Sequence, residues 1–251
     1  MKDVRPSEHR ECYASEAQRR VLSRLFETPF IRDNFFLTGG TCLAVFYLGH
    51  RISDDVELFL LREINLLEYT ALFREAEKVE RVVAESTGYC SYFYEGNVKV
   101  NFVWDKFSKD SVPLEYGIGS GLKVKLDSIS NIAVNKLCAL VSRFIPRDIV
   151  DLSVLFKNKV LVPEDFEHIY AAAAQREASL DDLLYVMGLF DEISAANENI
   201  VSALKPALKI ELSGEDVKVV FQDLGRQLKK MCACQTMKNL LSTRNRLNFK
   251  L

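Results

Sequence analysis

Residues 35–60 hold the pattern that most restricts the fold of this chain: an apolar run, the pair Gly39-Gly40, a second apolar stretch, a polar loop and a final apolar run. The final run opens with Asp55-Val56-Glu57. Because side chains alternate across a strand, Asp55 and Glu57 are expected on one face, roughly 6–7 Å apart. Two carboxylates there repel each other and resist burial. A divalent cation would remove both costs, and Mg²⁺ (or Mn²⁺) suits carboxylates and substrate phosphates.

The glycine pair is expected to form an anion site. Gly39 and Gly40 precede a predicted helix that starts at Thr41, and a helix N-terminus offers free N–H groups and a positive dipole end to phosphate. Arg51 and Ser53 stand in the loop before the acidic strand. If the two strands pair, phosphate donors and metal ligands would lie close together.

The rest of the pattern predicts an α+β chain. Apolar residues at helical spacing, alternating runs and turn residues give the expected elements. Helices are expected over 15–27, 65–79, 132–143, 147–158, 163–176, 180–195 and 214–232, and strands over 81–86, 89–94 and 98–104, while 122–126 is either one more strand or an edge segment. The expected division is a mixed α/β core, 1–126, followed by a helical domain, 127–251.

Composition excludes some classes of function. The chain has 251 residues and a net charge of −2, which gives no overall attraction to nucleic acid. Residues 224–251 nevertheless carry seven basic residues and no acidic one. This segment is either a polyanion-binding surface or a solvated basic helix, and both interpretations remain open. The polar start is not expected to act as a signal peptide, and no apolar run has the length expected of a membrane-spanning helix. Six cysteines without a secretory signal predict reduced thiols and a cytoplasmic location.

Three short motifs carry a resemblance to a known family. They read Leu37-Thr38-Gly39-Gly40-Thr41-Cys42-Leu43, Arg51-Ile52-Ser53 and Asp55-Val56-Glu57. A further stretch, 132–156, carries Lys136, Ala139, Arg143, Arg147, Asp148, Asp151 and Leu152. This order resembles the AbiEii-type nucleotidyltransferases, the toxin halves of type IV toxin–antitoxin pairs, within the superfamily of DNA polymerase beta. Each motif alone is weak, whereas the combination is specific.

The resemblance implies a fold and a set of roles. The fold would be a polymerase-beta-like core, a mixed β-sheet with flanking helices, followed by a C-terminal helical bundle. Asp55 and Glu57 would hold the metal. The nucleotide-binding residues would be Thr38, Gly39, Gly40, Thr41, Arg51, Ser53, Lys136, Arg143, Arg147 and Asp151. The catalytic residues would be Asp55, Glu57, Asn101, Lys136 and Asp148.

One position departs from the expected pattern. The superfamily places a third carboxylate on a later strand, in a run of the form Lys-apolar-Asp-Phe, and this chain reads Lys99-Val100-Asn101-Phe102 there. An amide can ligate a metal through its oxygen, but it brings no negative charge and is a poor base. Asp105 has the same strand parity as Asn101 but lies about 13 Å further along, and Asp54 should point to the other face.

Three functions compete on this basis. The first is a metal-dependent nucleotidyltransferase that moves a nucleotide from a nucleoside triphosphate to a hydroxyl of RNA, with tRNA as one acceptor, or of a protein. Such a toxin would have an antitoxin protein as its partner. The second is a catalytically degenerate module of the same fold that binds a nucleotide or a partner without chemistry. The third is a structural subunit that binds neither.

Overall fold

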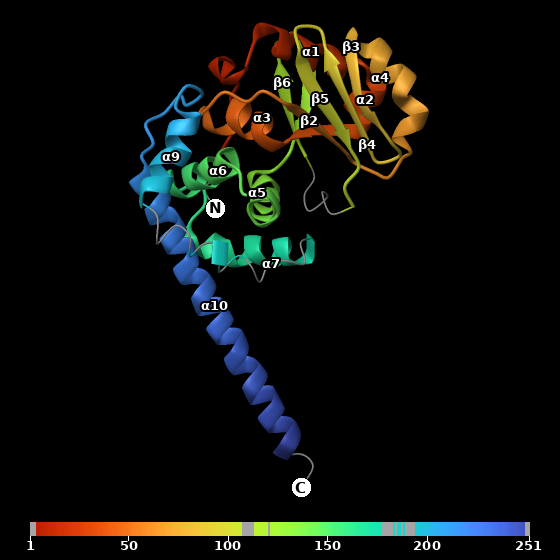
Figure 1. Cartoon of the computed structure of the whole chain (residues 1–251). Coiled ribbons are helices and arrows are strands. Elements are labelled where there is room, and N and C mark those ends of the chain that lie inside the picture. Colours follow the sequence, from red (N-terminus) through yellow and green to blue (C-terminus); the bar gives the residue numbers. More distant parts are fainter. Residues whose placement is uncertain are drawn as a thin grey trace. The chain divides into compact units, whose positions relative to one another are not determined.

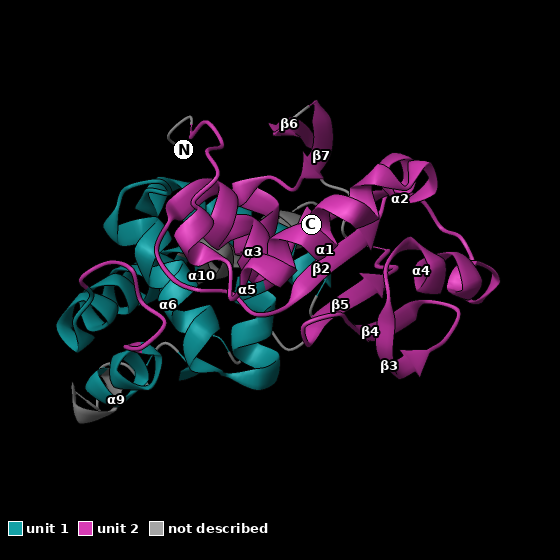
Figure 2. Ribbon diagram, turned by 90° about the horizontal axis from the view of Figure 1, so that it is seen from above, with its two compact units in different colours: residues 1–3, 136–204, 212–251 teal, residues 4–135, 205–211 magenta. Residues whose placement is uncertain are grey.

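The computed structural model describes residues 4–106, 113–119, 121–176, 183, 185, 186, 188 and 194–248, and only the backbone of 194–197, 232 and 234–248 (Figure 1). The chain forms two compact units (Figure 2). The sheet unit comprises residues 4–135 and 205–211, and the helical unit comprises residues 136–204 and 212–251. The boundary falls inside a helix, where the sequence predicted a division after residue 126.

In its described residues, the sheet unit has one mixed sheet of seven strands in the order β3-β4-β5-β2-β1-β7-β6. The strands are β1 (Phe35–Thr38), β2 (Val56–Leu60), β3 (Val79–Glu85), β4 (Tyr89–Tyr94), β5 (Val98–Val103), β6 (Leu114–Ile118) and β7 (Leu122–Leu126). Strand β1 pairs antiparallel with β2 and parallel with β7, and β2 pairs parallel with β5. The mixed sheet with its helices confirms the predicted α+β class.

Helices of the sheet unit begin where the sequence offers caps and proline. They are η1 (Arg10–Cys12), α1 (Glu16–Glu27), α2 (Pro29–Asn34), α3 (Gly39–Leu43), η2 (Ala44–Leu48), η3 (Leu66–Tyr69), α4 (Thr70–Ala76) and the first part of α5 (Ile129–Arg143). The Ser15 side chain accepts the backbone N–H of Gln18 and so caps α1. Pro29 occupies the first turn of α2, where its missing N–H costs nothing.

An aromatic cluster fills the core of this unit. The rings of Phe73 and Phe102 stack at 4.1 Å, and Phe35 meets Phe102 edge-on at 5.4 Å. Tyr92 and Tyr94 are fully buried beside them. Strands β1, β2 and β5 therefore rest on a close-packed layer, which fixes the backbone that carries the candidate site.

The helical unit contains the rest of α5, then α6 (Pro146–Lys157), η4 (Pro163–Asp165), α7 (Phe166–Arg176), α9 (Ser194–Leu204) and α10 (Gly214–Asn248). Helix α10 packs against α6, α7 and α9. It buries Val217, Phe221, Leu224 and Leu228, which recur at helical spacing. Among the described residues, no helix is both long enough and apolar enough to cross a membrane.

Several expected boundaries differ from those observed. The helix expected to start at Thr41 begins at Gly39 and widens into the π-helical turn η2. The expected helix over 214–232 continues to Asn248. Strand β6 was not predicted, because it is short, contains Gly117 and, among the described residues, pairs with β7 alone at the edge of the sheet. Most of the helix expected over 180–195 lies outside the described residues.

Candidate active site

The acidic strand meets the glycine turn directly. In the β1–β2 pair, Thr38 lies opposite Glu57. Gly39 follows with φ of +68°, a left-handed conformation that glycine adopts without steric cost. A Cβ atom placed on Gly39 would lie 1.6 Å from Oε2 of Glu57. The Glu57 carboxylate therefore rests against the backbone of the turn, in space that only a glycine leaves free.

The loop before β2 packs onto the second glycine. A Cβ atom on Gly40 would lie 2.6 Å from Nη2 of Arg51 and 2.9 Å from Oγ of Ser53. Oγ1 of Thr41 lies 3.1 Å from Oγ of Ser53 and donates to the carbonyl oxygen of Asp55. The structure thus brings together the residues predicted from the turn, the loop and the acidic strand.

A returning segment holds this loop in place. After α9 the chain re-enters the sheet unit at 205–211. There the N–H of Ile52 donates to the carbonyl of Ala207 and the N–H of Lys209 to the carbonyl of His50, both at 2.8 Å. On the other side, the N–H of Ser53 donates to the carbonyl of Cys12 at 3.0 Å. Backbone bonds on both sides fix the loop that carries Arg51.

Strand β5 adds two residues to the acid pair. In its parallel pairing with β2, Glu57 lies beside Asn101 and Val56 beside Val100. Nζ of Lys99 lies 3.8 Å from Oδ2 of Asp55, with both side chains about one-third exposed. Paired residues and their second neighbours share a sheet face. One face therefore presents the carboxylates of Asp55 and Glu57 together with the ammonium group of Lys99 and the amide of Asn101.

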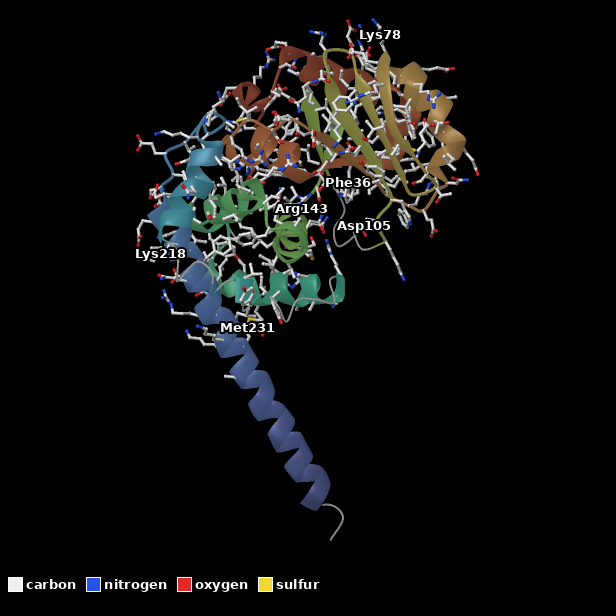
Figure 3. All side chains as sticks on the ribbon, in the orientation of Figure 1. Phe36, Lys78, Asp105, Arg143, Lys218 and Met231 are labelled. Carbon is white, nitrogen blue, oxygen red and sulfur yellow. The ribbon has the colours of Figure 1, made fainter. Side chains whose placement is uncertain are left out.

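The Asn101 side chain is fixed from β4. Its Oδ1 accepts a hydrogen bond from Oγ of Ser91 at 2.8 Å and another from the hydroxyl of Tyr89 at 3.0 Å. Asn101 is 7% exposed and Ser91 is fully buried. The sequence pattern did not point to the hydroxyls of Tyr89 and Ser91, because it is the pairing of β4 with β5 that brings them to Asn101. Asp54 precedes β2, and Asp105, which Figure 3 labels, follows the end of β5.

Asp127 is a buried carboxylate that the sequence pattern did not single out. Oγ1 of Thr38 donates to Oδ2 of Asp127 at 2.5 Å, so this hydroxyl is used inside the protein rather than at the surface. Asp127 also accepts the N–H of Ser128 at 2.8 Å and Nδ2 of Asn131 at 2.9 Å. It therefore ties the end of β1, just before the glycine turn, to the start of α5. An Asp-Ser pair ahead of a predicted helix is a capping signal that could have revealed it.

The predicted site residues of the helical unit form a buried ion-pair cluster. Nζ of Lys136 lies 2.7 Å from Oδ1 of Asp148 and 2.7 Å from Oδ2 of Asp151. Nε of Arg143, labelled in Figure 3, lies 2.9 Å from Oδ2 of Asp148. The Asp148 and Asp151 side chains are fully buried. Arg147 stands in the first turn of α6. Such contacts support a structural role for the cluster within its own unit.

Asp55 and Glu57 fit a magnesium ion that arrives with a nucleotide. No group of three or more His, Cys, Asp or Glu side chains suited to a metal occurs among the residues whose placement is described. Mg²⁺ is commonly held by one or two carboxylates together with substrate phosphates and water. The two acids beside the glycine turn meet that requirement once phosphates supply further oxygens.

Comparison with known proteins identifies the family. The family model described as nucleotidyl transferase AbiEii toxin, type IV toxin–antitoxin system, matches residues 20–230. A search of curated proteins gave no match. Among solved structures, the nucleotidyltransferase toxin MenT4 from Mycobacterium tuberculosis has a TM-score of 0.50 and 15% identity, covering 83% of this chain and 81% of that chain. JHP933 from Helicobacter pylori has a TM-score of 0.41 and 20% identity, covering 91% and 99% respectively.

The family match agrees with the geometry and with the resemblance seen in the sequence. The likeness to MenT4 supports the fold of a nucleotidyltransferase. The family match extends over both units, from α1 into α10. The chain belongs to the AbiEii family of nucleotidyltransferase toxins of type IV toxin–antitoxin systems.

Proposed function

We propose that this protein transfers a nucleotide from a nucleoside triphosphate to a hydroxyl group, with Mg²⁺ or Mn²⁺ bound by Asp55 and Glu57. One observation carries the proposal: the Glu57 carboxylate lies against Gly39, so a cation ligand and a phosphate-binding turn share one small region. The backbone N–H groups at the start of α3 and the cationic Arg51 beside Gly40 suit the triphosphate.

The reaction divides between the parts of this site. The glycine turn and Arg51 would hold the phosphates, while Asp55 and Glu57 would hold the cation. When bound, the cation neutralises phosphate charge and polarises the oxygens around the reacting phosphorus. The acceptor oxygen forms a bond to the α-phosphorus, the bond from that phosphorus to the bridging oxygen breaks, and pyrophosphate leaves. The hydroxyl proton passes to a carboxylate or to solvent. Catalysis here is mainly positioning and charge stabilisation.

The acceptor and the partners are proposed from weaker signals. The basic composition of 224–251 supports RNA, with tRNA as one candidate, over a protein hydroxyl. Family membership supports an antitoxin protein as the partner. Nucleotide-binding roles for Lys136, Arg143, Arg147 and Asp151, and a catalytic role for Asp148, remain proposals from the resemblance. The free cysteines Cys12, Cys42, Cys90 and Cys138 support a cytoplasmic location.

A transfer assay tests this function. The protein is incubated with each of the four labelled nucleoside triphosphates, Mg²⁺ and bulk tRNA, and the tRNA is then examined for label. We expect transfer by the unaltered protein, loss in Asp55→Asn and Glu57→Gln, and retention in Glu63→Gln, which alters an exposed acid of the same unit. Absence of transfer to RNA and to protein acceptors, with every nucleotide, would reject the proposal.

The alternative is a module that binds nucleotide without transferring it. The observation in its favour is the uncharged, hydrogen-bonded Asn101 beside Glu57, which leaves two carboxylates on this face. This alternative predicts thermal stabilisation by a nucleoside triphosphate, through ligand linkage, with no label transfer. An activity that disappears in Asp55→Asn would exclude it.

A further inference from the structure

We infer that Tyr89 and Ser91 hold the Asn101 carboxamide so that its N–H₂ group, together with Lys99, binds the triphosphate directly. The inference rests on the proposed function, because it assigns a further part of the same site. It divides the site between two strands. Asp55 and Glu57, at β2, take the cation, and β5 takes the anion.

The first step concerns the amide oxygen. A carboxamide oxygen has two lone pairs. The hydroxyls of Tyr89 and Ser91 occupy both, at 3.0 and 2.8 Å. An oxygen already accepting two hydrogen bonds has no further lone pair for a metal. Asn101 therefore does not act as the oxygen ligand that the sequence allowed.

The second step concerns the amide nitrogen. Ser91 and Tyr89 both belong to β4, so the oxygen of Asn101 turns toward β4. The carboxamide is planar, and its nitrogen and oxygen diverge from the same carbon, so an oxygen held by Tyr89 and Ser91 leaves the N–H₂ group directed away from those two hydroxyls. On that side, β2 places Glu57 directly beside Asn101. The amide thus offers hydrogen-bond donors on the side where the carboxylates and the glycine turn meet.

The third step concerns Lys99, which precedes Asn101 by two residues and so shares its face. Its ammonium lies 3.8 Å from Oδ2 of Asp55 and remains one-third exposed. Lys99 and Asn101 therefore form a row of donors along β5, opposite the acids of β2. A phosphate group beside a bound cation would accept from both, and hydrogen bonds between charged partners are the stronger kind.

Asn101→Asp separates this role from a structural one, because the two side chains have nearly the same shape. A carboxylate could still accept from Tyr89 and Ser91, so the fold should persist. Binding of the α,β-methylene analogues of ATP, GTP, CTP and UTP is measured by calorimetry, once in EDTA and once in Mn²⁺. Mn²⁺ binding is measured separately by electron paramagnetic resonance. Thermal unfolding of each variant is recorded alongside.

We expect opposite effects on the two ligands. Asn101→Asp replaces a donor to phosphate with a negative charge, so analogue affinity in EDTA should fall roughly ten- to hundredfold. Its added charge should tighten Mn²⁺ binding. Lys99→Met should weaken analogue binding in EDTA, while Glu57→Gln should weaken Mn²⁺ binding. Tyr89→Phe frees one lone pair of Asn101 and should weaken analogue binding less, with Tyr69→Phe, a tyrosine of η3, as the matched control.

The outcomes separate this inference from the proposed function. If Asn101→Asp binds the analogue in EDTA as tightly as the unaltered protein, or weakens both ligands together, the donor role is wrong. If the unaltered protein binds the analogue only when Mn²⁺ is present, equal analogue affinities of Lys99→Met and the unaltered protein in Mn²⁺ would also show that it is wrong. Analogue binding that depends on Asn101 without any label transfer would support the donor role and reject the transferase. Failure to bind any analogue with or without Mn²⁺ would overturn both.

Discussion

Gly39→Ala offers the most direct test of the geometry. The left-handed φ of +68° at Gly39 costs an alanine about 1–2 kcal/mol of folding free energy. The new Cβ would also lie 1.6 Å from Oε2 of Glu57, so the carboxylate has to move by more than an ångström. Because Glu57 is flexible, this movement should cost little stability but should displace a metal ligand. A misplacement of that size can lower a catalytic rate about 10²-fold.

A matched control separates the two effects. Gly117, in β6 of the same unit, has open space around its position, so Gly117→Ala should leave stability equal or slightly higher. Urea denaturation gives the free energies of unfolding, and Mn²⁺ binding with label transfer reports the site. We expect Gly39→Ala alone to lose stability, and to lose Mn²⁺ affinity and transfer by a larger factor. Equal stability and equal Mn²⁺ affinity in the two variants would refute the argument that Glu57 rests on Gly39.

Three further predictions concern buried groups. Lys136→Met leaves two fully buried carboxylates without their shared cation, so denaturation should show a loss of about 3–5 kcal/mol. Thr38→Val keeps the shape but removes the hydroxyl bonded to Asp127, and should cost about 1–3 kcal/mol in the same assay; an unchanged midpoint would contradict that bond. Burial raises the pKa of the Cys12 thiol from 9.0 to about 11. The unfolded thiol therefore loses its proton first, and the free energy of unfolding should fall between about pH 9 and 11 more steeply than in Cys12→Ala.

The local pattern predicted much of the sheet unit. Gly39-Gly40 after an apolar run, and two acids spaced by one apolar residue, indicated a turn beside an acidic strand. The β1–β2 pairing and the contact of Glu57 with Gly39 agree with that expectation. Helices with regular apolar spacing were found near their expected ranges, because burial of one face enforces the period.

Contacts between distant segments were beyond such reasoning. Asp127 reaches Thr38 across 89 residues, and the segment 205–211 binds the loop after His50. The spacing of residues along the sequence does not identify such partners, because distant segments of a chain can come together in many different pairings. The orientation of Asn101 likewise depends on which residues β4 places opposite it.

The sequence by itself determined the kinds of groups present and their local periods: a glycine turn, an acid pair on one strand face and a family signature. Only the tertiary structure decided which partners those groups have. Strand register placed two hydroxyls on the Asn101 oxygen, and helix packing enclosed Lys136 between two carboxylates. The physical reason is that backbone periodicity is a local property, whereas hydrogen-bond and ion-pair partners depend on long-range packing.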